Sequence, residues 1–188
     1  MKLYLLRHGQ TEGNQRMLYY GTTNLPLLPE TETALRRNAA RYPKVGRYYV
    51  SGMLRTVQTL RAIYGDVPYT VLPDLREIDF GIFEMHSYEE LKDTPAYQDW
   101  ILDAEHKPCP GGESAIQVQE RSVRVIDRLL AKDEDALCIS HGGTIGAIML
   151  YYFGGIRFDY MVQPGQGVCL EAHGGKPERW YRIPEETK

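Results

Sequence analysis

The sequence has few cysteines, and their arrangement excludes two common classes of small protein. Only Cys109, Cys138 and Cys169 occur among the 188 residues, far apart and without CxxC spacing. An odd number of scattered cysteines indicates neither a disulfide framework nor a zinc site. We therefore expect free thiols that are buried as small apolar side chains.

The chain also lacks a long apolar run and a large excess of charge of either sign. No segment is apolar for long enough to span a bilayer, and Met1-Lys2 leads directly into a strand-like segment without a secretory signal. We expect a cytoplasmic protein, either a monomer or a homodimer, with no membrane partner. A net charge of -3 gives no overall attraction to nucleic acid, so nucleic acid is not an expected partner and anion binding must be local.

The pattern of apolar residues predicts an α/β fold. Strand-like runs at 3–6, 47–51, 69–72 and 136–140 alternate with helical patterns at 31–42, 53–64 and 144–153 and with a helix that starts at the capping box 114–117. Such alternation predicts right-handed crossovers, hence a mostly parallel β-sheet with helices on both faces. Two further strands around a turn are expected at 166–183.

The length of the chain favours a single domain over residues 1–188. Within it, two short amphipathic helices at 87–105 precede the breaker run 108–112. We interpret the segment at about 79–112 as a small lid-like insertion. The stretch from 10 to 29 has no sustained period and is expected to be a long functional loop.

Two predicted strands each end in a histidine followed by glycine. Arg7 and His8 follow the first apolar run, and His141 follows the run at 136–140. Ligands of α/β sheets gather at the carboxyl ends of the strands. One such histidine is usually structural, but two with an adjacent arginine favour a functional site.

The residue types at this edge are suited to binding phosphate. The guanidinium groups of Arg7 and of Arg55, which follows the second strand, match phosphate oxygens, and imidazole can donate a proton or attack. Gly142 and Gly143 begin a helix whose free amides could bind an anion. A leaving alkoxide needs a proton, and Glu77 is the preferred donor in a loop that also holds other carboxylates.

Five short motifs lie in order along the chain: Arg7-His8-Gly9-Gln10-Thr11, then 51–59, 75–81, Gly112-Glu113-Ser114 and Ser140-His141-Gly142-Gly143. Together they resemble the histidine phosphatase superfamily, also called phosphoglycerate mutase-like, over essentially the whole chain. The resemblance implies that His8 is the nucleophile and that Arg7, Arg55 and His141 complete the phosphate pocket. It implies Glu77 as proton donor, Asn14 as a further contact and Thr11 as part of the substrate site.

The chemistry that this resemblance implies is metal-independent hydrolysis of a small-molecule phosphomonoester. Neutral His8 would attack phosphorus and form a phosphohistidine, while the cations hold the other phosphate oxygens. Neither a metal nor another cofactor is expected.

Within the superfamily, the chain looks most like the α-ribazole phosphatases, which remove phosphate from a cobalamin precursor. The similarity lies in Phe83-Glu84-Met85, the segment 100–103, the segment 111–114 and Gln166-Gly167. Asn24 stands where many members have aspartate, and Thr31-Glu32 stands where a glycine is usual. We expect lid aromatics to stack on the alcohol portion of the substrate, and Asn24 and Glu84 to make polar contacts with it.

Several alternatives remain open from the sequence. A phosphoglycerate mutase fits less well, because the spacing between Glu77 and Glu113 leaves little room for the insertion that mutases carry; a broad-specificity sugar or nucleotide phosphatase is a further alternative. A non-catalytic phosphate-binding regulatory module could share the fold, although intact His8 and Glu77 argue against it. A metal hydrolase is disfavoured because the histidines are scattered and no ligand motif such as HExxH is present.

Overall fold

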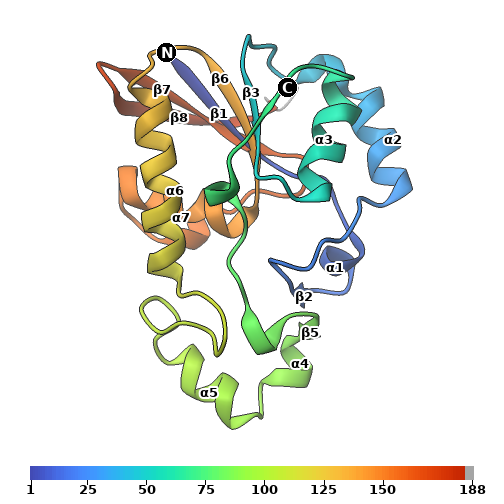
Figure 1. Cartoon of the computed structure of the whole chain (residues 1–188), viewed down its shortest axis with the longest axis vertical. Helices are drawn as coiled ribbons and strands as arrows, with labels where there is room; N and C mark the ends of the chain where they lie inside the picture. The colour runs from blue at the N-terminus through green and yellow to red at the C-terminus, as the bar shows by residue number, and fades with distance from the viewer. Residues whose placement is uncertain (185–188) are drawn as a thin grey trace.

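A six-stranded sheet forms the centre of the molecule in the computed structural model, which describes residues 1–184 (Figure 1). The strand order is β4 (Thr70–Val71), β3 (Tyr48–Val50), β6 (Ala136–Ser140), β1 (Lys2–Arg7), β7 (Gly167–His173) and β8 (Lys176–Ile183). The first four strands are parallel to one another. Strand β7 pairs with β1 in the antiparallel direction, and β8 pairs with β7 in the same way. The predicted α/β class with a mostly parallel sheet is confirmed, and the two strands expected at the tail form the antiparallel edge.

The two strands that end in histidines lie side by side at the middle of the sheet. β1 pairs with β6 in parallel, with Leu5 opposite Cys138 and Arg7 opposite Ser140. Every residue of β6 is buried, as expected for a strand that is covered on both faces. The shared direction of β1 and β6 brings His8 and His141 to the same edge.

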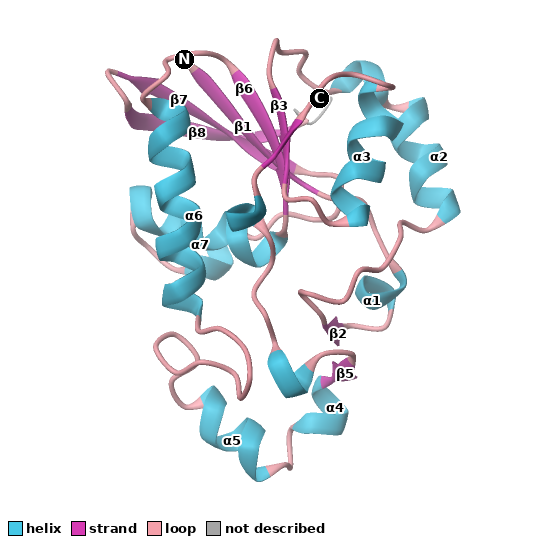
Figure 2. Cartoon of the chain, in the orientation of Figure 1, coloured by secondary structure: helices cyan, strands magenta, loops and turns pink. Residues whose placement is uncertain are grey.

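Helices cover both faces of the sheet, as predicted (Figure 2). Helices α6 (Ala115–Leu130) and α7 (Gly142–Phe153) enclose one apolar core, and α2 (Pro29–Arg37) and α3 (Leu54–Tyr64) enclose the other. The helix expected to continue to residue 42 is interrupted at Asn38, whose side-chain amide donates to the carbonyl of Ala34. A 3₁₀ helix, η1 (Ala39–Arg41), follows it.

The segment predicted as a lid extends away from the sheet and has a small core of its own (Figure 1). It contains β5 (His86–Ser87), α4 (Tyr88–Leu91) and α5 (Pro95–Ile101). Its ends are tied together, because the amide of Glu113 donates to the carbonyl of Asp79 at 2.8 Å. Its core comprises Phe83, Leu91, Tyr97, Trp100 and Cys109.

The long loop expected at 10–29 contains regular structure that the sequence pattern did not reveal. Helix α1 (Glu12–Gln15) begins at a capping box, and β2 (Leu18–Tyr19) pairs with β5 of the segment predicted as a lid. These elements are too short to produce a recognisable period. This pairing connects the loop after the first motif to the segment that contains β5.

Three further 3₁₀ helices complete the described chain: η2 (Pro73–Leu75), η3 (Gly81–Phe83) and η4 (Arg157–Tyr160). None of the helices within residues 1–184 has the length and apolar character needed to cross a membrane. The last residues of the predicted domain, 185–188, lie outside the described residues.

Candidate active site

His8 is held so that one ring nitrogen remains available for attack. Its backbone amide donates to the carbonyl of Ser140, and its Nδ1 lies 2.6 Å from the carbonyl oxygen of Gly9. A carbonyl only accepts, so Nδ1 carries the proton and Nε2 keeps its lone pair. The ring lines a cavity of about 800 Å³.

The surroundings of His8 favour the neutral imidazole. Burial lowers the pKa of His8 well below its ordinary value, and the positive charges of Arg55 and Arg7 add to the effect, which outweighs the bond to Gly9. A neutral ring with a fixed tautomer is the form required of a nucleophile.

This environment predicts that the His8 ring will not titrate between about pH 6 and pH 8. Imidazole ¹⁵N NMR of the free protein, assigned with a His8→Gln variant, measures this directly. The pKa of His8 is lower in the folded protein than in the unfolded chain, so the unfolded chain is protonated at this residue first. His8 should therefore make the free energy of unfolding fall as the pH drops below about 6.5. A His8 midpoint near the ordinary value would contradict this description of the site.

His141 lies directly behind His8. The two ring centroids are 5.1 Å apart in an edge-on arrangement, within the distance that one shared phosphate site requires. Nδ1 of His141 accepts from Nε of Arg55 at 3.3 Å, and its Nε2 lies 2.9 Å from Oγ of Ser51. Both ring nitrogens are thus engaged by protein groups, so His141 would have to exchange one of these partners to contact phosphate.

The two predicted arginines reach the site from different elements. Arg55, near the start of α3, is fully buried and donates to the carbonyls of Thr23 and Gly21 at 2.9 and 2.7 Å. Nη1 of Arg7 donates to the carbonyl of Val162 at 2.7 Å. These bonds orient both guanidinium groups, and both groups line the same cavity as His8.

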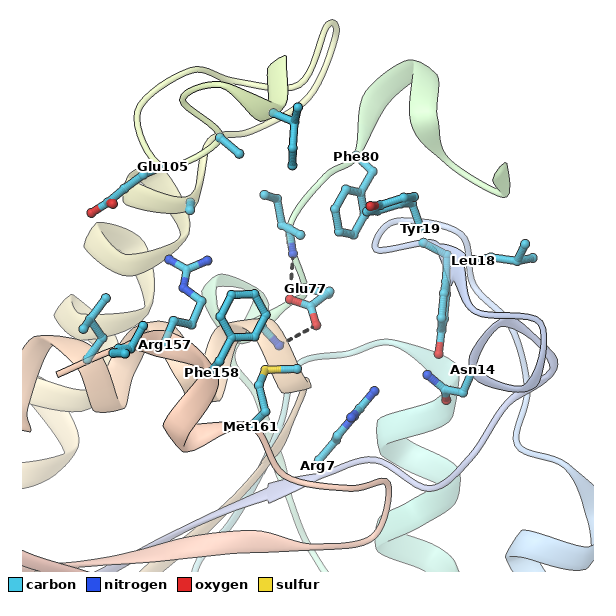
Figure 3. Close-up of a pocket in the computed structure, with 18 of the residues that line it drawn as sticks. Arg7, Asn14, Leu18, Tyr19, Glu77, Phe80, Glu105, Arg157, Phe158 and Met161 are labelled. Atoms are coloured by element: carbon cyan, nitrogen blue, oxygen red, sulfur yellow. Dashed lines mark hydrogen bonds between the residues drawn. The ribbon is translucent and has the colours of Figure 1, made fainter. Parts of the chain in front are cut away.

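Glu77 lines that cavity from the segment between η2 and η3. Its Oε2 accepts from the amide of Gly143 at 3.0 Å, and its Oε1 accepts from the amide of Ile78 at 3.1 Å (Figure 3). The same Oε1 accepts from the hydroxyl of Thr144 at 3.3 Å. The start of α7 therefore positions the carboxyl group. A β-carbon at Gly143 would lie 2.6 Å from Oε1, so only glycine allows this approach.

The start of α7 differs from the anion site that the sequence predicted. The amide of Gly143 is already occupied by Glu77. Gly142 is buried and does not line the cavity; its missing side chain leaves space for the guanidinium of Arg7, which a β-carbon would approach to 3.1 Å. The two glycines thus permit close packing of Glu77 and Arg7.

Arg121 holds the backbone that carries Glu77, a role that the sequence analysis did not anticipate. This buried side chain of α6 forms two bonds to the Glu113 carboxylate, each 2.9 Å long. It also donates to the carbonyls of Asp74, Arg76 and Glu77. Burial would raise the pKa of Glu113, but its bond to Arg121 and the nearby positive charges lower it. The paired charges clamp the Glu77 segment to α6.

Replacement of Arg121 by methionine should lower the free energy of unfolding by about 3–5 kcal/mol, because Glu113 would remain without its buried partner. Urea denaturation measures the change. Arg76 contacts the same carboxylate with a more exposed side chain, so Arg76→Met should cost only about 1 kcal/mol or less. Equal losses in the two variants would contradict the clamp.

Two residues of the first motif contribute in different ways. Asn14 lines the cavity, and its Oδ1 accepts from the amide and the hydroxyl of Thr11, which leaves its amide nitrogen for the cavity. Thr11 is fully buried, and its hydroxyl lies 2.6 Å from that of Tyr20. Thr11 therefore does not line the cavity itself, but its hydrogen bonds hold Asn14 and Tyr20, which do.

The two residues expected to contact the alcohol portion lie away from the cavity. Oδ1 of Asn24 accepts from the amide of Leu54 at the start of α3. Both oxygens of Glu84 are occupied by the 21–23 loop, including a 2.6 Å bond from the Thr23 hydroxyl. Burial would raise the pKa of Glu84, but these bonds and one from Phe80 lower it. The structure brings neither residue to the substrate side.

The segment that follows α7 forms a cavity wall that the sequence analysis left unassigned. The residues that follow Gly154 and Gly155 show no regular spacing of apolar side chains, so the sequence pattern predicts neither a helix nor a strand there. The cavity is lined there by Gly155, Ile156, Arg157, Phe158 and Met161.

Within residues 1–184, no three His, Cys, Asp or Glu side chains are grouped so that they could hold a metal ion.

The sequence of this chain is similar to those of known proteins. A family model described as the histidine phosphatase superfamily (branch 1) matches residues 3–177. The adenosylcobalamin/α-ribazole phosphatase of Salmonella typhimurium is 31% identical over 157 residues, which are 79% of this chain and 78% of that protein. The 2,3-bisphosphoglycerate-dependent phosphoglycerate mutase of Rhizobium etli is 28% identical over 164 residues, covering 78% of this chain and 77% of the mutase.

Solved structures give the same result for the fold. A phosphoglycerate mutase from Thermus thermophilus aligns with a TM-score of 0.75 and 33% identity, over 91% of this chain and 93% of that one. The α-ribazole phosphatase from Shigella flexneri aligns with a TM-score of 0.84 and 24% identity, over 94% and 93%. The family model covers most of the chain, and the chain therefore belongs to the histidine phosphatase superfamily and is a phosphatase.

Proposed function

We propose that the enzyme hydrolyses phosphomonoesters without a metal ion, through a phosphohistidine formed on His8. The observation that carries this proposal is the free Nε2 of a neutral, tautomer-fixed His8 in a cavity shared with two arginines and a carboxyl group. A regulatory module that only binds phosphate would not need this arrangement.

In the first step, Nε2 of His8 attacks phosphorus and the bond from phosphorus to the ester oxygen breaks. Glu77 donates its proton to that oxygen, which leaves as the alcohol. Arg7 and Arg55 stabilise the other phosphate oxygens, as does His141 after it exchanges a bond to Arg55 or Ser51 for one to phosphate. In the second step, Glu77 takes a proton from water, which attacks phosphorus and releases His8.

We also propose that the lid at about 79–112 binds the alcohol portion, with α-ribazole 5′-phosphate as the first candidate substrate. Phe80, Trp100 and Ile101 of this segment line the cavity, and their apolar surface suits a ring-bearing alcohol. The similarity to α-ribazole phosphatases supports the same choice. The small, highly charged 3-phosphoglycerate would gain little from this wall.

Measurements of kcat/KM with α-ribazole 5′-phosphate, 3-phosphoglycerate and 4-nitrophenyl phosphate test this proposal. Of the two biological esters, α-ribazole 5′-phosphate should have the higher kcat/KM. Hydrolysis of 4-nitrophenyl phosphate without hydrolysis of α-ribazole 5′-phosphate would agree with the proposed phosphatase chemistry but would refute the proposed substrate. Mutase activity with 2,3-bisphosphoglycerate would overturn the assignment of substrate.

Excess EDTA should leave hydrolysis unchanged, because the proposed charge stabilisation comes from guanidinium and imidazole groups. The rate with 4-nitrophenyl phosphate, measured before and after dialysis against the chelator, tests this expectation. Loss of activity that is restored by one divalent metal would exclude the proposed mechanism.

A further inference from the structure

A third arginine faces the cavity away from the phosphate-binding arginines. Arg157 begins η4, is partly buried and lines the cavity with Glu77 and Glu105. Figure 3 shows its side chain extending between these two carboxyl groups. Within residues 1–184 its guanidinium makes no hydrogen bond or ion pair, so its donors are available to a ligand.

The position of Arg157 is built into the packing of α7. A β-carbon at Gly146, in the middle of that helix, would lie 3.0 Å from Cγ of Arg157. The aliphatic stem therefore occupies the space that the glycine leaves open. This contact directs the guanidinium toward the cavity, where removal from water is unfavourable unless a ligand supplies hydrogen-bond acceptors.

An exposed aromatic ring lies beside this arginine. Phe158 lines the cavity although 80% of its surface is exposed, and its neighbour Ile156 is 63% exposed. In Figure 3, Phe158 lies on one side of Glu77, and Tyr19 and Phe80 lie on the other. Tyr19 and Phe80 are already packed against each other, with centroids 5.2 Å apart. A flat apolar group in this space would cover Phe158.

The charges around Arg157 favour a neutral acceptor over a second anion. Burial lowers the pKa of Arg157, and the negative charges of Glu77 and Glu105 oppose this shift. A carboxylate or second phosphate on the substrate would lie near the Glu105 carboxylate, which lines the same part of the cavity, and would be repelled by it. A ring nitrogen or carbonyl oxygen accepts a hydrogen bond without that repulsion.

We propose that Arg157 and Phe158 form the specificity subsite for the leaving alcohol, and that they select a heteroaromatic ring. Phe158 covers a face of the ring, and Arg157 donates to an uncharged acceptor at its edge. This inference deepens the proposed function and rests on it. It assigns substrate selection to the wall that follows α7, in addition to the lid.

Three esters with similar leaving groups test the subsite. Benzyl phosphate has a ring without an acceptor, pyridin-3-ylmethyl phosphate adds an uncharged acceptor, and 4-carboxybenzyl phosphate adds an anion. The kcat/KM of each is measured at mildly alkaline pH, where the pyridine is neutral, for the wild type, Arg157→Met and Phe158→Leu. Arg37→Met, which replaces an exposed arginine of α2, is the matched control.

We expect Arg157→Met to lower kcat/KM for the pyridyl ester about tenfold more than for the benzyl ester, as the loss of one hydrogen bond implies. Phe158→Leu should lower both by a similar factor, and Arg37→Met should change neither. Equal effects of Arg157→Met on all three esters, or its largest effect on the carboxybenzyl ester, would overturn the proposal.

Binding of the same esters to a His8→Ala background, measured by calorimetry, separates the subsite from the chemistry. If Arg157→Met weakens binding of the pyridyl ester selectively while the wild type hydrolyses no ester, the subsite stands and the proposed function fails. If the wild type hydrolyses all three esters and Arg157→Met leaves their ratios unchanged, the subsite fails and the proposed function stands.

Discussion

The His8→Ala variant should lose turnover by roughly 10⁴-fold or more, because the attacking nitrogen would be absent while the cations and Glu77 remain in place. Steady-state hydrolysis of 4-nitrophenyl phosphate measures this loss. The variant should still bind vanadate or inorganic phosphate, since Arg7 and Arg55 are held by carbonyls that the substitution does not touch. Loss of turnover with retained anion binding would separate the nucleophile from the binding site.

Two exposed histidines provide the matched control for this variant. His86 lies in β5 and His173 ends β7; neither lines the cavity. Alanine at either position should leave kcat within about twofold, as is usual for exposed positions away from a site. A His8→Ala enzyme that retains a substantial fraction of wild-type kcat would contradict the role of His8 as nucleophile.

The Glu77→Gln variant should slow hydrolysis of alkyl phosphates by about 10²–10⁴-fold, which is the usual contribution of a general acid. Activated aryl phosphates should be affected far less, because 4-nitrophenolate leaves without a proton. The substitution keeps the shape of the side chain and an oxygen that can accept from Gly143. A plot of log kcat/KM against the pKa of the leaving alcohol, for wild type and variant, measures the difference.

Glu120→Gln, in an exposed position of α6, is the control for the change of charge and should leave that plot unchanged. The slope of the plot should become much steeper for Glu77→Gln. Parallel lines, with an equal loss on alkyl and aryl esters, would mean that Glu77 supports structure or binding instead of acid catalysis.

The sequence predicted the parts of the site that depend on strand ends. A strand followed by a histidine and a glycine is a local pattern, and parallel pairing of two such strands is a simple consequence of α/β alternation. His8 and His141 therefore meet where the pattern placed them. The sequence predicts Arg55 because it stands just after the second predicted strand, which corresponds to β3.

Contacts that depend on loop packing could not be predicted from local patterns. The carboxylate of Glu84 looks like a ligand group in the sequence, but the fold directs it to the amides of the 21–23 loop. In the sequence, Arg121 resembles an ordinary arginine of a helix. In the structure its side chain is buried and donates five hydrogen bonds. Arg157 and Phe158 follow a glycine pair without periodicity, so only the path of the chain brings them to the cavity.

Identification of the phosphorylated residue tests the central claim most directly. Wild-type enzyme is mixed with a phosphomonoester, quenched within milliseconds in alkali, digested and analysed by mass spectrometry under conditions that preserve base-stable, acid-labile phosphohistidine. We expect phosphate on Nε2 of His8, formed and lost at rates at least as fast as turnover. Absence of any phosphoenzyme, or phosphate on a residue other than His8, would contradict the account.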